Sequence, residues 1–121
     1  MTLPEYTDGV LELYRIEEDT SKDYPEERLR ATNERIWYRE LSVYDTTRAK
    51  LAAASVEVTM KLAIPQYKKI NSKCVCMIDG KQHEIYNVAH VTTKDGFKES
   101  ELTLKTPAYE REVIDDTERT E

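Results

Sequence analysis

The stretch that decides the fold is residues 36–65, IWYRELSVYDTTRAKLAAASVEVTMKLAIP. Residues 36–44 alternate apolar and polar side chains, which is the period of a half-buried β-strand. An Asp-Thr-Thr triplet then supplies a helix-start signal, and residues 47–54 are rich in alanine, the best helix former. The strand pattern returns at residues 56–64 and stops at Pro65. The stretch therefore predicts a strand, a short inserted helix and a second strand.

This inserted helix, with outer bounds 46–55, is the first candidate functional element. A helix of about two turns is marginal by itself in water. Within an otherwise β-rich chain, either the chain's own sheet or another subunit must hold it. The pattern therefore predicts an interaction element and not a catalytic one. The residues predicted to form this interaction and gating helix are Thr47, Arg48, Lys50, Leu51 and Ala54.

The rest of the chain reads as further strands separated by turns. Residues 10–17 alternate loosely, residues 73–91 read as a hairpin around Asp79-Gly80, and residues 99–106 as a closing strand. Each of the three glycines follows an aspartate, a pair that accepts the positive φ of tight turns. The imperfect alternation after residue 85 predicts a β-bulge. We expect a mainly β fold, a small antiparallel barrel of about six consecutive strands with the short helix inserted between two of them.

Residues 18–33 form a charged segment between the first two strands. Pro25 at a helix start, followed by two glutamates, suits a short helix through Ala31. A long surface loop is the equal alternative, and loops of this length in compact domains tend to be functional or mobile. We treat the segment as an excursion between strands, and the family resemblance described below implies that it reaches the channel or a neighbouring subunit. Its candidate contact residues are Tyr24, Glu26, Arg28 and Arg30.

The charge pattern bears on domains and partners. The chain of 121 residues reads as one barrel domain over residues 1–109 and an acidic C-terminal tail over residues 110–121. The net charge is −6, and the tail's six acids and two bases contribute −4 of it. With no cluster of Lys and Arg in the sequence, binding that wraps nucleic acid is not expected. No apolar run is long enough to cross a bilayer, so we expect a protein made in the cytoplasm with no membrane partner.

The chemistry-bearing residues favour no catalytic or metal site. Cys74 and Cys76 lie on one face of a predicted strand, and a two-residue turn would place His83 opposite Cys76 and Ile85 opposite Cys74. Two thiolates and one imidazole are three potential zinc ligands, but the spacing is not that of known zinc motifs and a fourth ligand is missing. The favoured interpretation is that both cysteines are small buried hydrophobic residues. Without a nucleophile elbow or a phosphate loop, we expect no enzyme, no cofactor and no metal.

The order of these predicted elements along the chain resembles that of a known protein family. The first strand, the polar segment, Trp37 in a strand, the helix at 47–54 and the strand at 56–62 resemble the head-closure proteins of long-tailed bacteriophages, also called head–tail joining, head-completion or stopper proteins. The likeness continues in residues 77–88, which are similar to that family's late hairpin, and in residues 102–104, which are similar to its closing strand.

The resemblance implies a structural virion protein. Such proteins form a ring, here expected to be of about twelve copies, in the neck of the virion at the head–tail interface. The ring closes the DNA-filled capsid below the portal or its adaptor and presents the docking surface for the tail completion protein. Packaged DNA passes through its channel without specific binding. Two alternatives stay open: a tail-side completion or adaptor protein of the same virion, and an oligonucleotide-binding small barrel that stacks bases on Trp37, Tyr38 and Tyr86.

Overall fold

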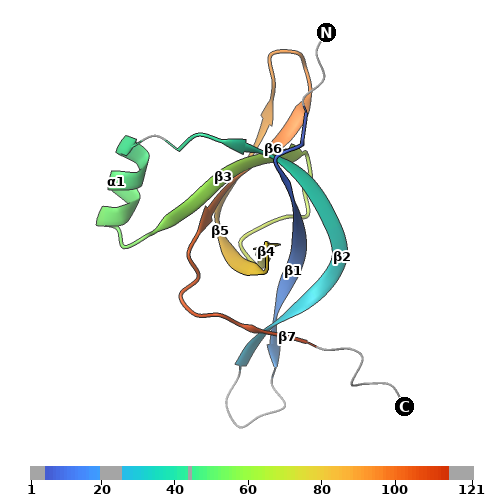
Figure 1. Ribbon diagram of the computed structural model, residues 1–121, viewed down its shortest axis with the longest axis vertical. Helices are drawn as coiled ribbons and strands as arrows, with labels where there is room; N and C mark the ends of the chain where they lie inside the picture. Colours follow the sequence, from blue (N-terminus) through green and yellow to red (C-terminus); the bar gives the residue numbers. More distant parts are fainter. Residues whose placement is uncertain (1–4, 20–25, 44, 115–121) are drawn as a thin grey trace.

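A computed structural model describes residues 5–19, 26–43 and 45–114 of the chain. Seven strands and one helix make up this part (Figure 1). In chain order they are β1 (Gly9–Asp19), β2 (Glu26–Leu41), α1 (Asp45–Ala53), β3 (Val58–Pro65), β4 (Cys74–Ile78), β5 (Lys81–Thr92), β6 (Lys98–Lys105) and β7 (Glu112–Val113).

Six of the strands close into a ring. The sheet runs in the order β1-β4-β5-β6-β3-β2-β7, and an additional ladder between β1 and β2 closes it. The expectation of a mainly β fold with about six strands and one inserted helix is therefore confirmed. The expectation that the strands pair consecutively holds for β1–β2, β2–β3, β4–β5 and β5–β6. It is wrong between β3 and β4, because β4 pairs with β1 and β3 pairs with β6. These long-range ladders give both edges of each strand in the ring a neighbour, which consecutive hairpins alone could not do.

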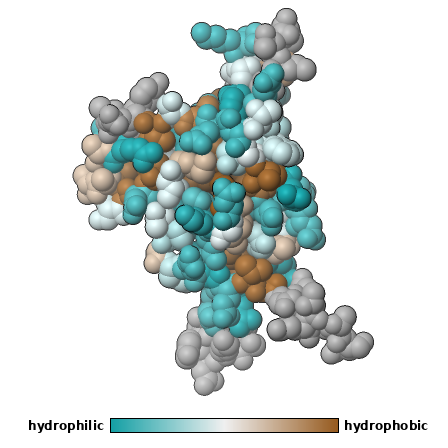
Figure 2. All heavy atoms as spheres, in the orientation of Figure 1, coloured by the Kyte–Doolittle hydropathy of each residue, from teal (hydrophilic) through white to brown (hydrophobic). Residues whose placement is uncertain are grey.

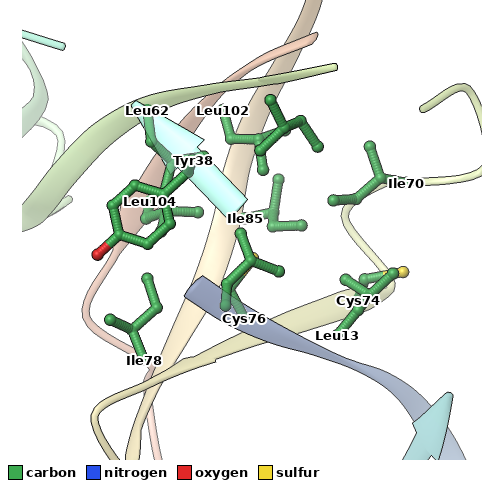
Figure 3. Packing of buried hydrophobic residues seen from close by; sticks show 12 residues of the cluster. Leu13, Tyr38, Leu62, Ile70, Cys74, Cys76, Ile78, Ile85, Leu102 and Leu104 are labelled. Carbon is green, nitrogen blue, oxygen red and sulfur yellow. The ribbon is translucent and has the colours of Figure 1, made fainter. Parts of the chain in front are cut away.

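The inside of the ring holds the hydrophobic core (Figure 3). Side chains from all six ring strands meet there, and Ile70 from the β3–β4 connection covers one end. Tyr38 lies in this core, and its ring explains Gly9, where a Cβ would come within 2.4 Å of the Tyr38 hydroxyl oxygen. The expected turn at Gly9 is therefore wrong: this glycine starts β1 and makes room for a packed ring.

The hairpins follow the predicted turn chemistry. Asp79 and Gly80 both have positive φ, as a two-residue hairpin turn requires, and they join β4 to β5. The register places Cys76 opposite His83 as expected. The predicted bulge is also present, as a register shift between Ile85 and Asn87 where β5 pairs with β6.

Two charged segments differ from the expectation. Residues 26–33 are neither a helix nor a loop but the first half of β2, which pairs with β1 from Glu26 onward. The solvated tail expected from residue 110 is wrong as far as Ile114, since β7 pairs with β2 in parallel and the Ile114 N–H donates to the Leu29 carbonyl at 2.8 Å. In both cases partners distant in sequence satisfy the backbone and override a local preference for helix or solvent.

Candidate interaction surface

Helix α1 projects from the side of the ring between β2 and β3 (Figure 1). Among the described side chains of the helix, the Arg48 guanidinium donates a hydrogen bond to the Val58 carbonyl of β3 at 2.9 Å. Lys50 is exposed, Leu51 is half-buried, and Ala54, just past the helix end, is exposed. The surface view shows apolar and polar residues mixed on this projection, at the left of Figure 2, without one continuous apolar face. The sheet therefore does little to hold the helix.

The C-terminal end of α1 has its own stabilising geometry. The Val56 N–H donates to the Leu51 carbonyl at 2.7 Å and the Ser55 N–H to the Ala52 carbonyl at 2.9 Å, which is the Schellman pattern. Ser55 occupies the left-handed position of this motif with φ of 63°. A non-glycine residue is strained there. The helix ends in a well-defined turn, but at an energetic cost.

A shallow groove lies where α1 meets the ring. It has a volume of about 390 Å³ and is lined by Arg48 together with residues 40–43 and 59–60. Among its other lining residues, Glu40 and Ser42 are exposed, whereas Leu41 and Met60 are half-buried. The helix and this groove form one surface, which we call the helix face. Of the predicted helix residues, Arg48 lines the groove, and the side chain of Thr47 lies outside the described residues.

The predicted contact residues of the charged excursion have a different setting. Tyr24 lies outside the described residues. Glu26, Arg28 and Arg30 lie on β2, far from α1 along that strand. Arg28 pairs with Glu112 at 3.6 Å, and Arg30 binds a carboxylate on β1. The side chains of Arg28 and Arg30 thus hold strands to one another and do not form a joint site with the helix.

Sequence reasoning missed an ionic anchor at the C-terminal segment. The Arg111 side chain, 8% exposed, binds Glu84 at 2.7 Å and Glu27 at 2.9 Å. Its backbone N–H donates to the Gln82 side chain, whose amide donates back to the Arg111 carbonyl. The Tyr109 ring lies 4.8 Å from the guanidinium carbon. We call residues 106–114 the strap, because this anchor binds them across the outside of the ring to β5 and β2.

A second anchor holds the segment before β1. Glu99 is 1% exposed and accepts two hydrogen bonds from Arg39, at 2.9 and 3.1 Å, and one from the Tyr6 hydroxyl at 2.6 Å. Burial by itself would raise the pKa of Glu99, but the hydrogen bonds from Arg39 and Tyr6 outweigh it and hold that pKa below its usual value. Burial, with the Glu99 hydrogen bond, raises the pKa of Tyr6 to about 12. The carboxylate is therefore ionised and paired at neutral pH.

The cysteines lie in the core. Cys74 and Cys76 are buried free thiols. Burial raises the pKa of Cys76 to about 12, so this thiol stays protonated at neutral pH and is not the thiolate that binds a metal. His83 lies opposite Cys76, but its Nδ1 is hydrogen-bonded to the Thr59 hydroxyl at 2.9 Å. In the described part of the chain, no three Cys, His, Asp or Glu residues are grouped closely enough to hold a metal ion.

The aromatic residues weighed for base stacking do not share a face. Tyr38 is 5% exposed and belongs to the core, whereas Trp37, its neighbour on β2, is 58% exposed. Tyr86 on β5 is 43% exposed, with the Lys105 ammonium 6.0 Å from its ring centre. Tyr38 therefore packs in the core, whereas the Trp37 side chain faces solvent.

A larger groove opens where β1 and β2 lose their regular pairing. It has a volume of about 740 Å³ and lies between residues 66–73 and a bulge in β2. At the bulge, Asn33 has φ of 62° and the Thr32 hydroxyl donates to the Leu13 carbonyl at 2.7 Å. The buried side chains of Leu13 and Cys74, which lie together at one end of the core in Figure 3, form its floor.

No protein-family model matches this chain. No curated protein matches it either. Among the described residues, no helix has the length and apolar character needed to cross a membrane.

Proposed function

We propose that this protein is a structural component of the head–tail connector of a long-tailed bacteriophage, where copies of it form a ring that closes the DNA-filled capsid. The observation that carries the proposal is the helix face, an exposed helix on a closed barrel, in a chain whose sequence order resembles head-closure proteins. The portal or its adaptor lies above the ring, and the tail completion protein docks below. The chain acts without catalysis or a cofactor.

The helix face suits such a role because the barrel does not need it. Arg48 is joined to the barrel by one hydrogen bond, and Lys50 is exposed. A helix this short has too little intrinsic stability to persist by propensity alone. We propose that α1 exchanges between folded and unfolded states in the free protein and is held by a neighbouring subunit or by the channel in the ring. Assembly then supplies the free energy that the helix lacks.

The passage of DNA is consistent with the charge of the chain. The net charge of −6 provides no general attraction for phosphates. Most arginines of the described residues are already bound to carboxylates, as Arg39 and Arg111 are. DNA would therefore move through the ring without being held.

The decisive experiment removes the protein from the virion. Particles assembled without this chain should be full heads that leak DNA and carry no tails, as seen by electron microscopy. A complementing copy with Leu51→Pro should fail in the same way, because proline removes a backbone donor and breaks the helix. Ser55→Gly, which relaxes the strained helix end, is the matched control and should restore tailed particles. Normal particles in the absence of the chain would refute the proposal.

A second candidate function has one observation in its favour. The 740 Å³ groove is lined by Arg15, Lys69 and Lys73, which an oligonucleotide-binding barrel could use for phosphates. Against it, Tyr38 is buried and neither Trp37 nor Tyr86 lines the groove, so none of the three residues expected to stack bases faces it. The aromatic residue in its lining is Tyr67, which is half-buried. Salt-dependent binding of single-stranded DNA to the purified protein would favour this candidate, and its absence would exclude it.

A further inference from the structure

Three cations that form no ion pair with a carboxylate of the described chain gather in the groove of 740 Å³. Arg15 from β1 and Lys69 and Lys73 from the β3–β4 connection line it, against a single carboxylate, Glu34. All four side chains are exposed. Three cations and one carboxylate give the groove a charge of +2 on a chain whose net charge is −6.

Six other cations of the described residues form ion pairs with carboxylates. Within the described residues, no carboxylate forms an ion pair with Arg15, Lys69 or Lys73, although acids outnumber bases in this protein. An uncompensated cluster beside a groove favours an acidic ligand. The cations that do form ion pairs are Arg28, Arg30, Arg39, Lys61, Lys105 and Arg111.

The wall of the groove formed by β2 also offers backbone hydrogen bonds. On the edge of β2 that faces away from β1, β7 pairs at Arg28 and Leu29, and β3 pairs from Arg39 onward. In the part of the chain that the structure describes, no strand pairs with this edge between Leu29 and Arg39. An open sheet edge is a template for an added strand, and β7 shows that this edge accepts one. The ligand should therefore be an extended chain.

We propose that this groove binds the acidic segment 115–121 of a second copy of the chain. That segment, DDTERTE, has four acids and one base, a charge of −3 that complements the groove. Seven extended residues span about 23 Å, enough to run along the open edge of β2. Its carboxylates meet the three cations while its backbone pairs with β2. The inference names the contact between neighbouring copies in the proposed ring. The contact itself does not depend on the proposed function; only the closure of the copies into a ring rests on it.

A second copy is favoured over the same chain by the register of β7. Pairing of Arg28 with Glu112 and Leu29 with Val113 sets a fixed offset between β2 and the strap. The bulge at Thr32 and Asn33 lies between this pairing and Glu34, so a strand that continues β7 within one chain would lose its register with β2 before it reaches the groove. The segment of a second copy is not bound to this offset. A segment on one copy that enters a groove on the next is a head-to-tail contact, the type that closes into rings.

The test uses charge reversals in the full chain, with self-association measured by sedimentation velocity at low ionic strength. The groove variant is K69E/K73E and the tail variant is D116K/E118K. Each should weaken the association at least about tenfold relative to the wild type, and the chain that carries all four changes should recover it, because the charges again complement. The matched control, K94E/K98E, makes the same charge change near the β5–β6 turn and should associate like the wild type.

Mixing the two variants isolates the head-to-tail contact. The groove variant keeps an intact tail and the tail variant an intact groove, so a mixture should form heterodimers at concentrations where neither variant associates by itself. A wild-type protein that shows no salt-sensitive association overturns the proposal. Equal association of all variants also overturns it. So does a change in the hydrogen-exchange protection of the groove that follows reversal of the tail charges but does not depend on protein concentration, because it would show that the tail docks within its own chain. Normal virions without the protein, together with heterodimers in solution, would refute the proposed function and leave this inference standing.

Discussion

The strap and helix α1 are both short segments outside the barrel core, but they are held in opposite ways. Arg111 has a buried side chain and ties the strap to two strands through charge-assisted hydrogen bonds, two of which reach Glu84 and Glu27. Arg48 ties α1 to the barrel through a single bond to a carbonyl. The strap is therefore part of the folded domain, whereas α1 depends on its own marginal propensity. The difference teaches that position outside the core does not decide whether a segment is free to bind a partner; its anchoring does.

Replacing Arg111 should break this comparison most strongly. Arg111→Ala would leave Glu84, whose side chain is 14% exposed, without its closest cation, and removing one partner of a buried pair costs about 3 kcal/mol. Denaturant unfolding should show this loss, and hydrogen exchange should show faster exchange in the strap. Lys61→Ala, which removes a pair of 3.8 Å between more exposed groups, is the control and should cost less than about 1 kcal/mol. Equal losses for the two variants would mean that the strap is not specially anchored.

The anchor at the other end of the chain should behave like the strap and not like the helix. Glu99→Gln removes a buried charge that binds Arg39 and Tyr6, and should cost about 2 kcal/mol at neutral pH. Since folding lowers the pKa of Glu99, its contribution is complete above the unfolded pKa of about 4.3 and is lost as the pH falls through the lower folded pKa. The difference between wild type and variant in denaturant unfolding should therefore shrink in acid. A constant difference across that range would show that the charge is not the cause.

Relaxing the helix end should strengthen α1 alone. Ser55 has φ of 63°, so Ser55→Gly should stabilise the helix by about 0.5–1 kcal/mol. Slower hydrogen exchange of the α1 amides would report this gain, with the free energy of unfolding of the barrel unchanged. If exchange does not slow, Ser55 is not a source of strain in solution.

Breaking the helix should have the smallest effect on the barrel. Leu51→Pro costs the helix about 3 kcal/mol, yet the free energy of unfolding of the barrel should change by less than about 0.5 kcal/mol, because α1 contributes little to it. Circular dichroism should show the β signal intact. A variant that unfolds entirely would place α1 in the core and remove the contrast with the strap.

Local patterns in the sequence determined the elements of this fold. Alternation at residues 36–41, the alanine-rich segment that forms α1, and the hairpin turn at Asp79 and Gly80 were all predictable, because each reflects hydrogen bonding and side-chain direction among near neighbours. The helix residues of the candidate surface were predicted from the same signals.

Only the tertiary structure decided the closure of the ring and the anchors. Arg111 and Glu27 lie 84 residues apart, and no local periodicity records that they meet. The same holds for the open edge of β2 and for the cations beside it, which come from β1 and from a distant connection. The charged segment before Arg35 became a strand because β1 satisfies its backbone, a contact between strands that propensity does not describe.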